Sequence, residues 1–173
     1  MRLLFLTAAL ALATPTSYAQ DAAGVVVEAK TVSSSRKETE RWSTSWGSYD
    51  RSIYRSRSIS ATVRADQAGE AKVICYWIGS IIGHRNRRKI ITETTEITLK
   101  AKQPSVIEFA ELFVEDDTKY NALRVRQRDG LKYYGWVVRV VDSNGRTLAT
   151  TAAREPMIQL VAWHLRQNPQ PAP

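Results

Sequence analysis

The chain has 173 residues, with 25 Lys and Arg against 17 Asp and Glu, and a formal net charge of +8. Because 43% of its residues are hydrophobic, it can build a core for one domain, which excludes a disordered chain. The single cysteine, Cys75, excludes an internal disulfide, so the hydrophobic core must hold the domain. The basic charge by itself gives only a weak, salt-sensitive attraction to acidic polymers.

The first 19 residues have the pattern of a secretory signal peptide. Arg2 precedes an apolar run over residues 3–13, and the small residues Ser17 and Ala19 stand at the −3 and −1 positions of a cleavage site. The run is too short for a membrane span, which needs about 20 residues. We expect cleavage near Ala19, export to the periplasm or the medium, and no transmembrane segment. The expected organisation is a signal peptide over 1–19, one domain over 20–166 and a disordered Pro-rich tail over 167–173.

The first part of the expected domain contains two strands and a polar stretch between them. Residues 24–32 are rich in β-branched side chains, which favours a strand. Residues 33–51 are rich in Ser and charge, which predicts a loop or a loose edge segment. In residues 58–65, apolar side chains such as Ile59 and Val63 alternate with polar ones, and this period of two predicts a half-buried strand.

The middle of the chain predicts a central strand and a basic connection. Residues 70–82, EAKVICYWIGSII, are apolar on both faces, as in the central strand of a sandwich. We therefore expect Cys75 and Trp77 to be buried. The stretch GHRNRRK, residues 83–89, then joins this strand to a second strand over 90–99. Residues 106–114 are ambiguous between a strand and a short helix, and the polar residues 115–120 predict a loop.

The last third of the chain predicts a further strand, a hairpin and a helix. Residues 122–128 alternate, with arginines on one side, and Asp129-Gly130 turns the chain. The tetrad DSNG at 142–145 predicts a hairpin turn after a strand that buries Trp136, because Asn and Gly tolerate positive φ. Pro156 begins a short helix in which Met157 and Val161 recur at helical spacing.

Seven or eight short strands with turns at near-regular spacing predict an all-β fold. The expected architecture is an antiparallel, immunoglobulin-like β-sandwich with a short C-terminal helix. A Greek-key barrel is the alternative, because periodicity alone does not separate the two.

Three segments together resemble a family of small exported bacterial proteins. The matching residues are Ser58, Ser60, Val63, Arg64, Tyr76, Trp77, Ile78, Tyr133, 135–140, Asp142, Gly145, Arg146, Leu148 and Ala149. The resemblance spans most of the chain after the signal peptide, on strand and turn patterns. It implies an immunoglobulin-like or fibronectin-III-like sandwich and no assigned activity. The paired cysteines of antibody domains are absent, so a disulfide-bonded immunoglobulin domain is not implied.

The sequence contains no signature of catalysis, metal binding or cofactor binding. His84 and His164 are the only imidazoles, no G-x-S-x-G surrounds a serine, and Cys75 lies in an apolar run. Metal motifs are also missing, although residues 115–117, EDD, could supply oxygen ligands to Ca²⁺ or form a solvated acidic turn. We therefore expect a protein that is not an enzyme and has no cofactor. A small enzyme whose carboxylate pair the sequence does not reveal remains an alternative.

Aromatic and basic side chains are the candidates for ligand binding. They are Trp42, Trp46, Tyr49, Arg85, Arg87, Arg88, Lys89, Arg124, Arg126 and Arg128. Exposed tryptophans on a sandwich could stack on sugar rings, or they could cover the edge of the core. The arginines could bind an acidic polymer or envelope glycan, or they could be solvated strand faces. Export and the absence of RNA-binding signatures argue against nucleic acid. The leading hypothesis is a non-enzymatic exported module that acts by binding or as an envelope component, and the alternative is a carbohydrate- or polyanion-binding module.

Overall fold

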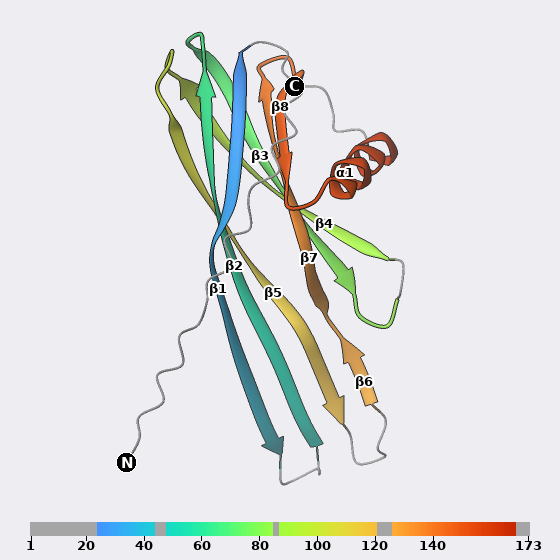
Figure 1. The fold of residues 1–173 in the computed structure, drawn as a ribbon. Helices are drawn as coiled ribbons and strands as arrows, with labels where there is room; N and C mark the ends of the chain where they lie inside the picture. The colour runs from blue at the N-terminus through green and yellow to red at the C-terminus, as the bar shows by residue number, and fades with distance from the viewer. Residues whose placement is uncertain (1–23, 44–47, 85–86, 121–125, 169–173) are drawn as a thin grey trace, which may run out of the picture.

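The computed structural model describes residues 24–43, 48–84, 87–120 and 126–168, and over these it is a sandwich of two antiparallel sheets (Figure 1). The first sheet has the order β1-β2-β5-β6, formed by Val25–Ser43, Ser48–Ala65, Ser105–Tyr120 and Arg126–Asp129. The second has the order β4-β3-β7-β8, formed by Arg88–Leu99, Gly69–Ile81, Leu131–Asp142 and Thr147–Ala152. The predicted all-β sandwich with a short C-terminal helix is confirmed, and the two sheets do not close into a barrel over the described residues.

The strand order has the connectivity of an immunoglobulin-like sandwich. The chain crosses between the sheets after β2, after β4 and after β6, so β1-β2-β5 faces β4-β3-β7-β8. The short strand β6 occupies the edge beside β5, where immunoglobulin domains place a strand that precedes its neighbour in the chain. Here β6 follows β5 directly, so it is a return of the same hairpin.

The core lies between the sheets and comes from the alternating positions of each strand. Ile59 and Val63 of β2, Trp77 of β3 and Phe109 of β5 are fully buried. Each such side chain contributes about 1.5–3 kcal/mol when it is removed from water. Cys75 and Trp136 are also buried, so the predictions for Cys75, Trp77 and Trp136 are confirmed.

A helix covers part of the outer face of the second sheet. The helix α1, Pro156–Gln167, buries Met157 and Val161 against Ile78 and Val137. Pro156 stands in its first turn, where a missing N–H costs nothing. The predicted C-terminal helix is confirmed; of the predicted tail over 167–173, Gln167 ends α1, Asn168 caps it, and 169–173 lie outside the described residues. No helix of the described part is long and apolar enough to cross a membrane.

The predicted hairpin turn between β7 and β8 is confirmed. The amide of Gly145 donates to the carbonyl oxygen of Asp142 at 3.0 Å, which closes the turn. The Asp142 side chain accepts the amides of Asn144 and Arg146 at 2.9 and 2.8 Å, so the carboxylate satisfies two N–H groups of the loop.

Two polar segments that predict loops are in fact strands. Residues 33–43 continue β1, which pairs with β2 from Ser33↔Ser58 to Ser43↔Ser48, and residues 115–120 are the end of β5. The ambiguous stretch 106–114 is also part of β5. Residues 33–43 and 115–120 lack the alternation of a half-buried strand because the second sheet does not cover them, so neither of their faces needs to be apolar. Of the two alternatives for residues 33–51, the edge segment was correct for 33–43, whereas 48–51 begin the inner strand β2 and 44–47 lie outside the described residues.

Candidate functional site

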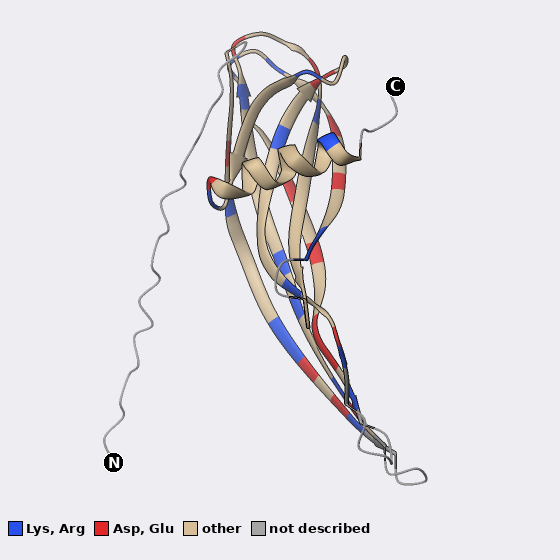
Figure 2. Cartoon of the chain, turned by 90° about the vertical axis from the view of Figure 1, so that its right-hand side faces the viewer, with Lys and Arg blue, Asp and Glu red and all other residues tan. Residues whose placement is uncertain are grey.

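The first sheet is longer than the second and continues past it as a polar extension (Figures 1 and 2). We call this extension the arm and define it as residues 34–43, 48–56, 114–120 and 126–129. Its strands rise about 3.3 Å per residue, so the arm is about 30 Å long. One of its faces continues the inner face of the sandwich, and the other continues the outer face.

The inner face changes from apolar to charged where the second sheet ends. On β2, Ile59 and Val63 face the core, whereas Arg51 and Arg55 keep the same alternation on the arm, on either side of the buried Ile53. The change follows from solvation, because an uncovered strand face can carry charged side chains without burying them.

A layer of aromatic side chains closes the core at the base of the arm. The ring of Phe113 meets the rings of Trp77 and Tyr133 edge-on, with centroids 6.2 and 5.4 Å apart. The guanidinium of Arg57 lies over Tyr133, 4.7 Å from the ring centroid. Burial raises the pKa of Tyr133, and the charge of Arg57 opposes this effect. The arm therefore begins at a cation–π contact between the two sheets.

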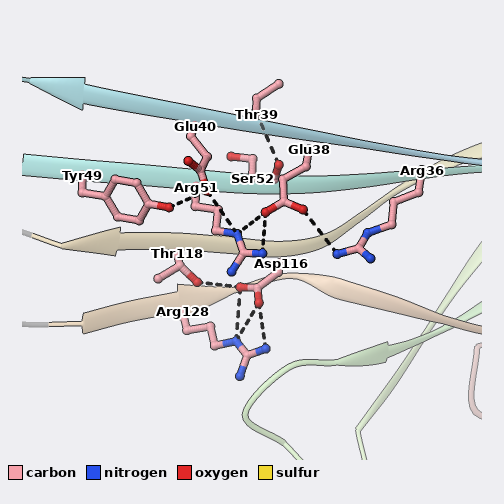
Figure 3. A network of polar contacts seen from close by, with 10 residues as sticks. All are labelled: Arg36, Glu38, Thr39, Glu40, Tyr49, Arg51, Ser52, Asp116, Thr118 and Arg128. Atoms are coloured by element: carbon pink, nitrogen blue, oxygen red, sulfur yellow. Dashed lines mark hydrogen bonds and ion pairs between the residues drawn. The ribbon is translucent and has the colours of Figure 1, made fainter.

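One ionic cluster on the inner face joins β1 to β2 (Figure 3). The carboxylate of Glu38 accepts hydrogen bonds from Arg51 and, at 3.4 Å, from Arg36. The hydroxyl of Tyr49 donates to Glu40 at 2.9 Å. Desolvation, followed by this hydrogen bond to a carboxylate, raises the pKa of Tyr49, so its hydroxyl remains a donor at neutral pH.

A second cluster joins β5 to β6. Arg128 binds Asp116 with two nitrogens, Nε at 3.1 Å and Nη2 at 2.7 Å from Oδ2, and Thr118 donates to the same carboxylate at 2.6 Å. A β-bulge opposite Ile53 and Tyr54 inserts Glu115 into β5, and Glu115 accepts a hydrogen bond from Arg55 at 2.7 Å. In these pairs the arginines keep part of their surface in water while the carboxylates are mostly covered, so the contacts orient the side chains more than they stabilise the fold.

The outer face of the arm is hollowed into a polar groove of about 490 Å³. Its walls come from three strands and carry Thr39, Arg41, Asp50, Ser52, Tyr54, Asp117 and Lys119. Glu40, whose carboxylate belongs to the inner-face cluster, also borders the groove. Asp117 accepts a hydrogen bond from Ser52 at 2.8 Å and lies 3.6 Å from the ammonium group of Lys119. Both faces of the arm thus mix acidic and basic side chains.

The residues 115–117, which the sequence offered as possible Ca²⁺ ligands, do not converge on one point. Glu115 binds Arg55, Asp116 binds Arg128 on the inner face, and Asp117 binds Ser52 on the outer face. Strand alternation sends Asp117 to the face opposite Asp116, and the bulge at Glu115 directs that side chain to Arg55 on β2 while Asp116 faces β6. In the part of the chain that the structure describes, no group of three or more His, Cys, Asp or Glu could hold a metal ion.

The pairing register brings several predicted binding residues to one end of the arm. Trp42 of β1 pairs with Tyr49 of β2, Tyr49 with Tyr120 of β5, and Tyr120 with Arg126 of β6. No sequence pattern connects Trp42 with Arg126, and strand pairing places these two positions in one row across the sheet. Trp46 and Arg124 lie outside the described residues, as do the side chains of Trp42, Tyr120 and Arg126.

The basic connection between β3 and β4 lies elsewhere. Arg88 packs over the ring of Tyr134 at 4.5 Å, on the side of the second sheet that α1 covers, and Arg154 packs over the same ring at 5.1 Å. Arg87 and Lys89 are exposed, and Arg85 lies outside the described residues. Arg88 therefore does not share a face with Arg128, which lies on the inner face of the first sheet.

Sequence reasoning missed the roles of three acidic members of the arm, Glu38, Glu40 and Asp116, and it considered Asp116 only as a possible Ca²⁺ ligand. A signal for two of them was present, because Arg36, Glu38 and Glu40 alternate in β1 and so share one face. The other potential reactive groups lie apart from the arm. His84 is exposed, His164 is half-buried on α1, and burial raises the pKa of the Cys75 thiol far above its ordinary value.

The chain was compared with known proteins by family, by sequence and by structure. No family model matches it, and no curated protein matches it in sequence. A solved structure from Akkermansia muciniphila is similar over 87% of this chain and 81% of its own, with 11% identity and a TM-score of 0.37. A Northeast Structural Genomics Consortium target is similar over 70% of this chain and 89% of its own, with 13% identity and a TM-score of 0.23. Likenesses this weak carry no argument about function.

Proposed function

We propose that the protein is a non-enzymatic, exported binding module that uses the arm to contact a glycan of the cell envelope. The observation that supports this is the uncovered inner face of the arm, which is long, polar and held in shape by ion pairs between strands. A sheet face that served only stability would be covered or shorter, because uncovered length adds no apolar burial.

The groups on this face suit sugar recognition. A sugar ring offers a C–H face that packs on aromatic rings and hydroxyls that both donate and accept hydrogen bonds. Tyr49 pairs with Trp42 and Tyr120 in the strand register at the end of the arm, and Glu38, Glu40 and Arg51 beside it provide acceptors and donors. Because these groups are already fixed by their partners, binding costs little additional ordering.

An acidic polymer is the second candidate, supported by the net charge of +8 and the exposed Arg87 and Lys89. The arrangement of charges on the arm favours a glycan over an acidic polymer. Its arginines alternate with carboxylates, and Arg128 already has a two-nitrogen contact to Asp116. A polyanion would have to compete with that carboxylate for the guanidinium.

A glycan array followed by titration of the best ligand tests the proposal. The variants Trp42→Ala and Tyr49→Ala should each weaken binding about five- to tenfold, which is what loss of one aromatic contact costs. Tyr134→Ala is the matched control, since Tyr134 is 36% exposed on the other sheet, and its affinity should be unchanged. Affinity should change little across a salt series.

Two results would contradict the proposal. In the first, no glycan binds, and heparin is retained no better than by an unrelated protein of equal charge. In the second, heparin binds with a steep salt dependence. Arg87→Gln and Lys89→Gln abolish this binding, whereas Tyr49→Ala has no effect. That result would assign an acidic polymer as the ligand and the β3–β4 connection as its site.

A further inference from the structure

A separate cleft lies between α1 and the outer face of the second sheet, which does not form the arm. Its volume is about 350 Å³, which is within the range of small-molecule sites. The floor and the helix wall are apolar, formed mainly by Val137, Ile158, Val161 and Leu165. Figure 2 views the molecule from the side on which α1 crosses the sheet.

The cleft exists because the side chains beneath one side of the helix are small. Met157 and Val161 hold α1 against β3 and β7. Over β8 the facing residues are Thr147 and Thr150, which do not fill the space up to Leu165. An apolar hollow therefore remains beside a helix that is otherwise well packed.

Two arginines line this apolar hollow, and no acidic side chain does. Arg139 of β7 stands between Ile74 and Thr150 in the register, is half-buried, and donates to the hydroxyl of Thr147. Arg166 lines the cleft from the last turn of α1. In the described part of the chain, neither arginine has an ion pair with a carboxylate.

A half-buried guanidinium without a counter-charge is the part of the cleft that points to a ligand. Removing a cation from water is costly unless an anion and hydrogen bonds compensate it. Thr147 supplies one hydrogen bond and no charge. A guanidinium keeps further N–H donors for a carboxylate, and Arg166 adds a second cation nearby.

We propose that this cleft binds an amphiphilic organic anion, of the class of a medium-chain alkyl carboxylate. The alkyl chain lies on Val137, Ile158 and Leu165, and the carboxylate accepts hydrogen bonds from Arg139 and Arg166. The inference is independent of the glycan proposal, because it uses a different sheet face and none of the residues of the arm.

Three probes separate the contributions of chain and charge when the whole protein is titrated by calorimetry and by ¹⁵N NMR. Decanoate carries both groups, decanol only the chain, and acetate only the charge. Decanoate should bind about tenfold more tightly than decanol, with amide shifts centred on Ala162 and Leu165, and acetate should not bind measurably.

Variants then assign the site. Arg139→Gln and Arg166→Gln should each weaken decanoate about tenfold without changing decanol, and Arg64→Gln, an exposed arginine on the other sheet, is their control. Arg166 is exposed, so its variant keeps the test valid if Arg139→Gln does not fold. Ala162→Phe should fill the cleft and remove both ligands, whereas Gln159→Phe on the exposed side of α1 should not.

The proposal is wrong if decanol binds as tightly as decanoate, or if both arginine variants bind decanoate like the wild type. It is also wrong if no probe binds up to its solubility limit, or if Ala162→Phe and Gln159→Phe reduce binding equally.

Discussion

Gly130 lies where the chain leaves β6 on the arm and enters β7 in the other sheet, and it gives the sharpest test of the structure. Its φ is +151°, a conformation that L side chains rarely adopt. A β-carbon built on it would lie 2.9 Å from the carbonyl oxygens of both Val114 and Glu115. Ordinary van der Waals contact begins at about 3.5 Å, so neither oxygen has room for a methyl group.

The variant Gly130→Ala should therefore be strongly destabilised. The backbone strain costs about 1–3 kcal/mol, and the clash costs a similar amount because the oxygens belong to a paired strand that cannot easily move. We expect a loss of about 3 kcal/mol in the free energy of unfolding. For a chain of this size that lowers Tm by about 6–12 °C.

Two other glycines provide matched controls in urea denaturation. Gly145→Ala has φ +78° but open space around it, so it should lose only about 1–2 kcal/mol from strain. Gly69→Ala has neither a positive φ nor a neighbour within 4 Å and should be neutral or slightly stabilising. If Gly130→Ala is as stable as Gly69→Ala, Gly130 does not pass as close to the carbonyl oxygens of Val114 and Glu115 as described above, and the reasoning is refuted.

Two further predictions concern Cys75 and Asp142. The Cys75 thiol should not react with a thiol reagent in the native protein and should react fully in urea, because it is completely buried. Since burial raises its folded pKa, the native state holds a proton that the unfolded state releases above about pH 8.5. Stability should then fall with rising pH by up to about 1.4 kcal/mol per unit, and Cys75→Ala should remove this slope. Rapid native labelling, or an unchanged slope in the variant, would contradict the buried thiol. Asp142→Ala should lower the free energy of unfolding by about 1 kcal/mol in chemical denaturation, because two loop amides lose their acceptor. Asp142→Asn keeps an acceptor oxygen and should lose much less stability. Equal losses in the two variants would show that the side-chain oxygen does not hold the turn.

The parts of the fold that were predictable are those in which burial leaves a pattern. The alternation around Ile59 and Val63, the two-faced apolar strand at Cys75 and the DSNG turn each result from a local rule, and the structure has all three. The strands of the arm were not predictable in this way. Their residues are polar on both faces, so only pairing with β2 makes residues 33–43 and 115–120 extended.

The candidate sites were likewise predictable only in part. The sequence identified Tyr49 and Arg128 as possible binding residues, one by its aromatic ring and the other by its charge. It could not reveal that Arg128 is bound to Asp116, because that pair depends on the register in which β6 returns along β5. The cleft beside α1 was also invisible, since Arg139 and Arg166 are 27 positions apart and meet only when the helix packs back on the sheet.

Composition and local pattern thus determined an all-β domain, its central strand, one hairpin and the final helix, because each depends on side chains close together in the chain. Tertiary structure decided how far the first sheet extends beyond the second, which charges are compensated, and where a hollow remains. These properties depend on which surfaces a distant strand or helix covers, and the side chains of a single segment do not encode that.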